Sequence, residues 1–101
     1  MPKRRTQSPP LAGSPPRRDA VRQPECHHDL RYWVAQQPRI ALKVLDLMVE
    51  VMRTPFAVTG KPEPLKALGA EIWSRRITQE HRLVYKVYHD RIDFLMARYH
   101  Y

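Results

Sequence analysis

The last third of the chain holds three short runs of strand-forming residues, and their spacing constrains the fold most strongly. The runs are EIWSRRIT (71–78), HRLVYKVY (81–88) and RIDFLMARYHY (91–101). All three are rich in Ile, Val, Tyr and Phe, as strands are. The linker HDR between the last two runs is short enough for a hairpin turn. These runs therefore predict an antiparallel meander.

Two helical segments precede the meander. DLRYWVAQQ opens with Asp29, a residue type that caps helices, and continues with apolar residues at helical spacing. PRIALKVLDLMVEVMR begins with Pro38, which the first turn of a helix accepts. Its broad apolar stripe comprises Ile40, Val44, Leu45, Leu47, Met48 and Val51. We expect this stripe to face the core, with a partner-binding groove as the alternative. The sequence thus predicts an α+β fold, with two N-terminal helices on one face of a three- to four-stranded antiparallel sheet.

Residues 1–28 differ in composition from the rest of the chain. They hold six of the ten prolines and six of the eighteen basic residues, without helical or strand periodicity. We expect a disordered Pro/Arg-rich extension over 1–28 and an ordered domain over 29–101. The extension is interpreted as a solvated tail or a misassigned start, with a weak RNA-binding arm as the alternative. Cys26, His27 and His28 lie close together, but a second ligand pair at zinc spacing is missing from the sequence, so we expect no metal site.

The overall composition indicates the kind of partner. The 101 residues carry a net charge of +8, which favours polyanionic partners such as RNA, DNA or an acidic protein. The single cysteine excludes an internal disulfide framework, and the sequence has no apolar run long enough for a signal peptide or a membrane span. We therefore expect a cytoplasmic protein that does not enter membranes.

Strand alternation assigns the side chains of the meander to two faces. On the middle run the apolar row of Leu83, Tyr85 and Val87 is expected to face the helices, which leaves Arg82, Val84 and Lys86 on the other side. On the first run Arg76 shares a face with Ile72 and Ser74, while Trp73, Arg75 and Ile77 lie opposite. On the third run one face receives Ile92, Phe94, Met96, Arg98 and His100, and the other Leu95, Ala97, Tyr99 and Tyr101. The sheet can therefore bury one face and offer a cationic groove on the other.

The reactive side chains suit one reaction class. The sequence offers no serine or cysteine nucleophile system and no Gly-rich phosphate loop. A carboxylate, a histidine and several guanidinium groups suffice to cleave RNA, where the substrate's 2′-hydroxyl is itself the nucleophile. Glu63 is the candidate base, because Pro62 and Pro64 enforce an extended backbone around it within the loop of residues 53–70. Nearby lysines would favour its ionised form.

His100 is the candidate acid, since a neighbouring phosphate would hold its proton ready for the leaving 5′-oxygen. Arg82, Arg76 and Arg98 are candidates for stabilising the charge on the phosphate. Each of these residues also has an ordinary structural interpretation. Glu63 could be a charged residue on a solvated loop, His100 an exposed residue near the chain end, and the arginines a solvated face.

The chain resembles the YoeB (Txe) toxins, a branch of the RelE/ParE superfamily of bacterial toxin-antitoxin modules. The resemblance rests on DLRYW, RTPF, GKPEPLK, WSRRIT, EHRLVYKV and the ending RYHY, and it extends over residues 29–101. It implies the RelE-like microbial RNase fold and a ribosome-dependent mRNA interferase. Such an enzyme cleaves mRNA in the A site of the 70S ribosome and needs no cofactor.

The resemblance also assigns roles to residues and implies partners. It makes Glu63 the general base, His100 the general acid and Arg82 the arginine that stabilises the scissile phosphate. Arg76 and Lys66 correspond to supporting cationic contacts, and Tyr101 to the terminal tyrosine that shapes the site. The implied partner is a YefM-like antitoxin whose C-terminal segment covers the toxin, and homodimers are common in the family.

One stretch departs from the family pattern. Family members usually begin with a short apolar strand before the first helix, but here RDAVRQPECHH takes its place. We therefore expect the first strand to be missing or altered, which would leave a sheet edge exposed. This departure keeps open a non-catalytic module that binds RNA, the ribosome or the antitoxin. A ParE-like gyrase inhibitor is a further alternative, although it has no use for the Glu63 and His100 pair.

Overall fold

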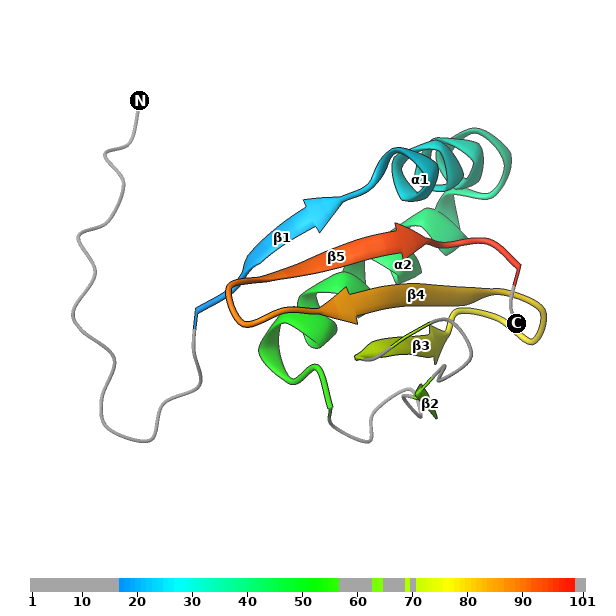
Figure 1. The fold of residues 1–101 in the computed structure, drawn as a ribbon. Coiled ribbons are helices and arrows are strands. Elements are labelled where there is room, and N and C mark those ends of the chain that lie inside the picture. The colour runs from blue at the N-terminus through cyan, green and yellow to red at the C-terminus, as the bar shows by residue number, and fades with distance from the viewer. Residues whose placement is uncertain (1–16, 57–62, 65–68, 70, 100–101) are drawn as a thin grey trace, which may run out of the picture.

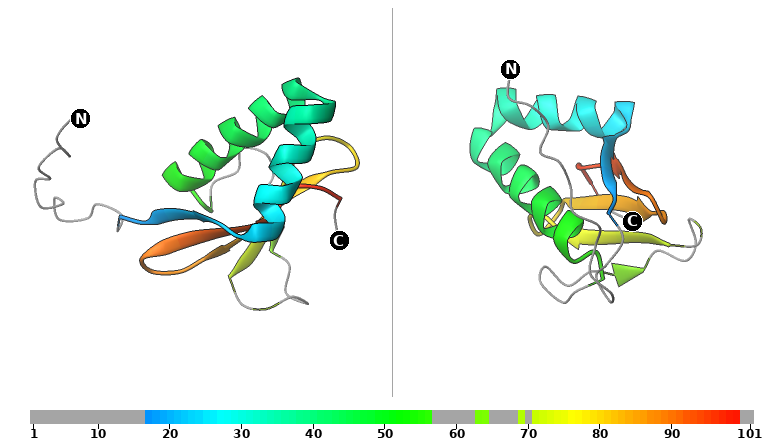
Figure 2. Two further views of the ribbon diagram at one scale, coloured as in Figure 1. Left: turned by 90° about the horizontal axis from the view of Figure 1, so that it is seen from above. Right: turned by 90° about the vertical axis from the view of Figure 1, so that its left-hand side faces the viewer.

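The computed structural model describes residues 17–56, 63–64, 69 and 71–99 (Figure 1). These residues form two helices and a five-stranded sheet in the order β1-β5-β4-β3-β2. Both helices lie on the same side of the twisted sheet (Figure 2). The predicted α+β architecture is thus confirmed. No helix in the described part of the chain is long and apolar enough to cross a membrane.

The strand β1 (Asp19–Arg22) corrects the expectation that the first strand is missing. It pairs in parallel with β5 (Arg91–Met96), so the sheet is mixed rather than purely antiparallel. Main-chain bonds from Asp19 N to Asp90 O (3.0 Å) and from Gln23 N to Phe94 O (2.9 Å) mark its two ends. None of its four residues is buried, so the strand has no apolar alternation by which the sequence could reveal it.

The first helix, α1 (Pro24–Gln36), also begins earlier than predicted. Gln23 occupies the N-cap and Pro24 the first turn, where its missing N–H costs no hydrogen bond. Asp29 is therefore not a cap but a buried residue in the middle of the helix. Because β1 and the first turn of α1 fall within residues 1–28, the predicted domain boundary at residue 29 is wrong.

The second helix, α2 (Pro38–Arg53), has the predicted bounds and begins with the predicted proline. Its buried residues are Ala41, Val44, Leu47, Met48 and Val51. The predicted stripe is confirmed except for Leu45, which is 40% exposed. Leu42 and Val49 are exposed beside it. The core lies between this stripe, the buried side of α1 and the sheet.

The remaining strands are β2 (Glu63–Pro64), β3 (Ile72–Arg76) and β4 (Arg82–Val87), which with β5 form antiparallel pairs. The predicted core row of Leu83, Tyr85 and Val87 on β4 is confirmed. The turn between β4 and β5 is the expected hairpin. Glu63 and Pro64 form a short strand within a segment that was predicted to be a loop.

A bulge in β5 corrects the predicted faces of the C-terminal run. Tyr85 pairs with Phe94, but the next residue, Val84, pairs with Met96, so Leu95 is an extra residue on β5. After this shift Ala97, rather than Met96, joins Phe94 in the core. Strict alternation predicted the reverse, because it assumed an uninterrupted strand.

Candidate functional site

The candidate site begins with two arginines and a serine on the sheet face away from the helices. Arg82 of β4 and Arg76 of β3 lie directly opposite each other in register. Arg82 is buried, and its Nε donates to Oγ of the fully buried Ser74 (2.7 Å). Arg76 is exposed. Two cationic residues at directly opposite positions of neighbouring strands make this part of the face suited to an anion.

Arg75 takes no part in this group, although it neighbours Arg76. It faces the helices and is fully buried, as the alternation of β3 predicts. Its Nε contacts the hydroxyl of Tyr85 (3.4 Å), and the same hydroxyl donates to the carbonyl of Pro55 (2.8 Å). This arginine therefore supports the end of α2 rather than a ligand.

The short strand β2 brings position 63 to the same region. Glu63 lies opposite Ser74 in the antiparallel pair of β2 and β3. Paired strands lie about 4.8 Å apart. The backbone of Glu63 is therefore one strand spacing from the serine that Arg82 contacts. Its extended conformation agrees with the prediction from its flanking prolines.

The C-terminal segment after β5 is fixed by α1. The carboxylate of Asp29 accepts a hydrogen bond from the main-chain N–H of Ala97 (2.9 Å). The indole N–H of Trp33 donates to the carbonyl of the same residue (2.8 Å). Asp29 and Trp33 are one helical turn apart, so α1 presents both groups side by side. Both polar groups of a buried main-chain unit are thereby satisfied.

Two residues further on, the main chain of Tyr99 is held in the same way by His81 and Arg82, at the start of β4. Its N–H donates to Nδ1 of His81 (2.7 Å), and its carbonyl accepts from the N–H of Arg82 (2.9 Å). Tyr99 has a φ of 67°, a left-handed conformation. Such a conformation costs about 1–3 kcal/mol for a residue other than glycine and persists only where the surroundings impose it.

Between Ala97 and Tyr99, the side chain of Arg98 lies against Tyr32 of α1. Its guanidinium carbon lies 3.5 Å from the ring centroid of Tyr32 and 4.9 Å from that of Tyr99. The arginine therefore makes cation–π contacts beside the segment.

Several predicted site residues lie outside the described part of the chain, namely Lys66, His100 and Tyr101, together with the side chain of Glu63. Their roles stay predictions. The described residues do show the main chain next to two of these positions. The side chain of Arg82 contacts Ser74, which lies opposite position 63, and the main-chain N–H of Arg82 donates to the carbonyl of Tyr99, which precedes position 100.

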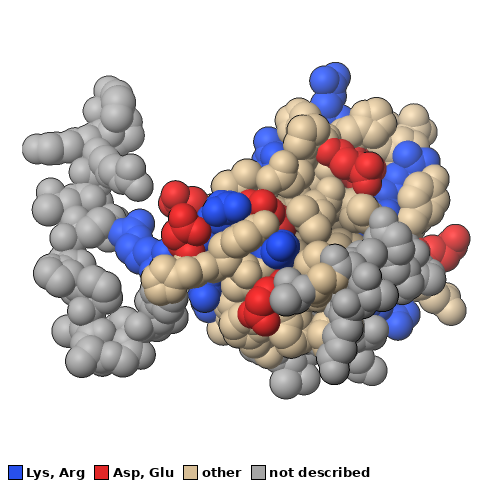
Figure 3. Space-filling model, viewed as in Figure 1, with Lys and Arg blue, Asp and Glu red and all other residues tan. Residues whose placement is uncertain are grey.

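Charge on the sheet face is less uniform than the sequence suggested. Figure 3 shows acidic and basic side chains interspersed on this face of the described residues. Asp93 of β5 lies opposite Lys86 and accepts a hydrogen bond from Arg91 (3.0 Å). The expected cationic groove is thus limited among these residues to the surroundings of Arg76 and Arg82.

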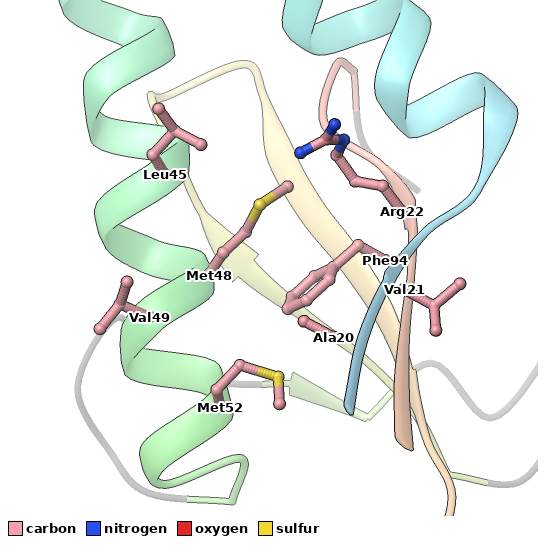
Figure 4. A pocket seen from close by; sticks show the side chains of 8 residues that line it. All are labelled: Ala20, Val21, Arg22, Leu45, Met48, Val49, Met52 and Phe94. Atoms are coloured by element: carbon pink, nitrogen blue, oxygen red, sulfur yellow. The ribbon is translucent and has the colours of Figure 1, made fainter. Parts of the chain in front are cut away.

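A hollow of about 630 Å³ lies elsewhere, between α2 and the edge formed by β1 and β5 (Figure 4). Met48 and Met52 of α2 and Phe94 of β5 contribute to its largely apolar lining, and Arg22 supplies a charged group. None of the described residues that line it carries a carboxylate or an imidazole. It also lies on the helix side of the sheet, so it is not the site of the predicted acid–base chemistry.

The side chains considered as metal ligands, Cys26, His27 and His28, do not form a common site. Cys26 is fully buried, whereas His27 and His28 are exposed on the same helix. Burial, with a smaller effect from nearby Asp29, raises the pKa of the Cys26 thiol to about 12. Within the described residues no cluster of three or more potential metal ligands occurs.

Sequence reasoning missed three residues that fix the C-terminal segment: Asp29, Trp33 and His81. Asp29 was interpreted as a cap, and Trp33 only as one of the apolar residues at helical spacing. The available signal was a carboxylate on the apolar side of a helix, four residues before a tryptophan. His81 lies in the quoted EHRLVYKV motif, but the bond to its Nδ1 depends on a contact 18 residues away in the chain.

A mixed sheet with two helices on one face, an arginine and serine pair on the other, and a C-terminal segment bonded to α1 define a small α+β fold with a cationic site. The model of the YoeB-like toxins of bacterial type II toxin-antitoxin systems matches residues 22–101. Toxin YoeB of Escherichia coli K12 is 48% identical over 77 residues, covering 76% of this chain and 92% of the relative. The chain belongs to the YoeB-like toxin family.

Solved structures agree with this assignment. A YoeB dimer from Staphylococcus aureus superposes with a TM-score of 0.76 at 32% identity, covering 84% of this chain and 99% of that one. The heterotetrameric YoeB–YefM toxin–antitoxin complex from the same species gives a TM-score of 0.70 at 34% identity, with the same coverage. The relatives thus include a toxin dimer and a toxin bound to its antitoxin. The described protein is a toxin of a type II toxin-antitoxin system.

Proposed function

We propose that this toxin is a metal-independent, ribosome-dependent endoribonuclease that cuts mRNA in the A site and so halts translation in the cytoplasm. The observation that carries the proposal is the position of Arg82. Its side chain contacts Ser74, opposite position 63, and its main-chain N–H holds the carbonyl of Tyr99. The candidate base and the residue that precedes the candidate acid therefore flank one buried arginine.

The proposed reaction is a transesterification. Glu63 takes the proton of the 2′-hydroxyl, the 2′-oxygen bonds to phosphorus, and the bond from phosphorus to the 5′-oxygen breaks. His100 gives a proton to that leaving oxygen, and a 2′,3′-cyclic phosphate remains on the upstream fragment. Arg82 stabilises the added negative charge, with support from Arg76 and Lys66. Arg98 and Tyr101 are proposed to contact the RNA beside the reacting phosphate.

Cleavage on programmed ribosomes tests this proposal. Ribosomes stalled with a chosen codon in the A site are mixed with the toxin, and the mRNA ends are mapped by primer extension. We expect cleavage only when ribosomes are present, and none when the nucleotide that supplies the 2′-hydroxyl carries a 2′-O-methyl group. A 2′-O-methyl mRNA that is cut normally would refute attack by the 2′-hydroxyl.

The acid and base are tested with matched substitutions. Glu63→Gln and His100→Gln are each expected to lower the single-turnover rate by roughly a hundredfold to ten-thousandfold. The controls are Glu25→Gln, exposed in the first turn of α1, and His89→Gln, in the exposed hairpin turn. These make the same chemical changes at residues that take no part in the group around Arg82, and they should leave the rate within about threefold of wild type. Ribosome binding without cleavage would instead indicate the non-catalytic binding module, and inhibition of DNA gyrase the ParE-like alternative.

A YefM-like antitoxin is the proposed partner. The antitoxin complex of the similar S. aureus toxin supports this proposal, and the net charge of +8 favours an acidic partner segment. Co-expression with the neighbouring antitoxin reading frame should restore growth and yield a complex that survives size-exclusion chromatography. Light scattering on the toxin alone would show whether it forms a homodimer, as the similar S. aureus toxin does.

A further inference from the structure

The conformation of Tyr99 depends on one side chain from the turn between β3 and β4. Its carbonyl bonds to a main-chain N–H, as in any strand pair, but its own N–H bonds to Nδ1 of His81 at 2.7 Å. The φ of 67° places the following peptide unit in a direction that extended backbone would not reach. Loss of the imidazole acceptor would thus remove one of two bonds that hold a strained residue.

His81 is itself held firmly enough to impose this geometry. Its main-chain N–H donates to Oγ1 of Thr78 (3.1 Å), and its carbonyl accepts from the N–H groups of Ile77 (2.8 Å) and Thr78 (3.1 Å). Its ring packs edge to face against Trp33, with centroids 4.7 Å apart, and lies tilted against the ring of Tyr99, with centroids 5.5 Å apart. The imidazole therefore has little freedom to follow the tyrosine if the segment moves.

The direction of the hydrogen bond defines the chemical state of this histidine. An Nδ1 that accepts from an amide N–H carries no proton, so the ring is the neutral form with its proton on Nε2. A protonated ring would present an N–H to the N–H of Tyr99 and break the contact. His81 in this state acts as an acceptor of fixed position rather than as a donor at Nδ1.

We infer that His81 is a positioning residue, whose neutral imidazole sets the conformation of Tyr99, the last described residue before the candidate acid. The inference rests on the proposed function, since it concerns the placement of the candidate acid. A displacement of about 1 Å at a reacting group can lower a rate roughly a hundredfold. By holding Tyr99, His81 would therefore affect the rate of the chemical step without contacting the RNA.

Three substitutions at His81 separate positioning from a general structural role. His81→Leu removes the acceptor and keeps an apolar side chain beside Trp33. His81→Asn restores an acceptor oxygen close to the position of Nδ1, and His81→Gln moves that oxygen by one methylene. His89→Leu, in the exposed hairpin turn, is the matched control. Circular dichroism establishes that each variant is folded.

Two measurements are made on each variant. The first is amide hydrogen exchange of Tyr99, followed by NMR with the full chain, and the second is single-turnover cleavage at saturating ribosomes beside the ribosome dissociation constant. For His81→Leu we expect at least tenfold faster exchange at Tyr99 and a cleavage rate about a hundredfold lower, with ribosome affinity within threefold of wild type. His81→Asn should recover most of both losses, and His81→Gln less.

Other outcomes overturn the inference. Unchanged exchange at Tyr99 in both His81→Leu and His81→Gln would show that the imidazole does not hold this amide. Fast exchange with an unchanged cleavage rate would show that the bond does not position the acid. If the leucine variant does not fold, the comparison of Asn with Gln decides the same question. Wild-type toxin that cleaves no mRNA refutes the proposed function instead, while the exchange data still decide whether His81 holds Tyr99.

Discussion

The two tryptophans allow a direct measurement of what one side-chain hydrogen bond contributes to the C-terminal segment. Trp33 is 2% exposed, and its N–H donates to the buried carbonyl of Ala97. Trp73 packs against Phe56 and the core, but its buried N–H has no acceptor among the described residues. Replacement by phenylalanine is therefore the same chemical change in two opposite hydrogen-bonding situations.

The expected magnitudes follow from this difference. Trp33→Phe leaves a buried carbonyl without its donor, which costs about 1–3 kcal/mol. It also removes two buried ring carbons, which adds about 1–2 kcal/mol. Trp73→Phe loses less packing, because Trp73 is only partly buried, and it removes an unsatisfied donor. We expect a loss of about 3 kcal/mol in the free energy of unfolding for Trp33→Phe and a change within about 1 kcal/mol of zero for Trp73→Phe.

Urea denaturation followed by far-ultraviolet circular dichroism gives both free energies, and equal slopes establish that the denatured states are comparable. The Tm of Trp33→Phe should lie roughly 10 °C or more below that of Trp73→Phe. Equal losses in the two variants, or a larger loss for Trp73→Phe, would refute the assignment of the Ala97 bond as a stabilising contact. Cleavage by the two variants, measured in parallel, would then show whether loosening this residue also affects activity.

Two further predictions concern the beginning of the domain. The native thiol of Cys26 stays protonated up to its pKa of about 12, while the unfolded thiol ionises near 9.0, so the unfolded state binds fewer protons between these values. Ionisation of this thiol should therefore make the free energy of unfolding fall with rising pH above 9, by up to about 1.4 kcal/mol per unit. In urea titrations Cys26→Ala should lack this contribution, whereas the buried Tyr85 hydroxyl, whose pKa burial also raises, adds a slope of the same sign at higher pH in both proteins. Deleting residues 1–16 should leave the Tm within about 2 °C, whereas deleting residues 1–23 removes β1 and should lower the Tm by more than about 5 °C. A Tm that is insensitive to the longer deletion would show that β1 contributes nothing to stability.

The parts of the fold that depend on side-chain periodicity could be predicted from the sequence. The stripe of α2 follows the 3.6-residue period, and a proline marks its first residue. The row of Leu83, Tyr85 and Val87 follows the two-residue period of a strand with one buried face. In both cases burial selects the residue type, so the pattern is visible in the sequence.

The parts that depend on main-chain bonds could not be predicted in this way. The strand β1 is held by hydrogen bonds to β5 and has no buried residue of its own. The bulge at Leu95 changes which residues face the core without any change in composition. Neither feature selects particular side chains strongly, so residues 19–22 were predicted to lie in a disordered tail and Met96 to share a face of the sheet with Phe94.

The candidate site combines both kinds of information, because its residue types are nominated from the proposed chemistry whereas its described geometry depends on main-chain bonds. Arginine, glutamate and histidine could be nominated because the proposed chemistry requires those groups. The described end of the C-terminal segment depends instead on Asp29, Trp33 and His81, whose side chains bond to the main chain of Ala97 and Tyr99. A residue that takes part in such a bond through its main chain can be of almost any type. Only the residue that contributes the side chain is therefore recognisable in the sequence. Polar groups on the buried side of α1 and in the turn after β3 are therefore the sequence features from which a clamped C-terminal segment could be inferred.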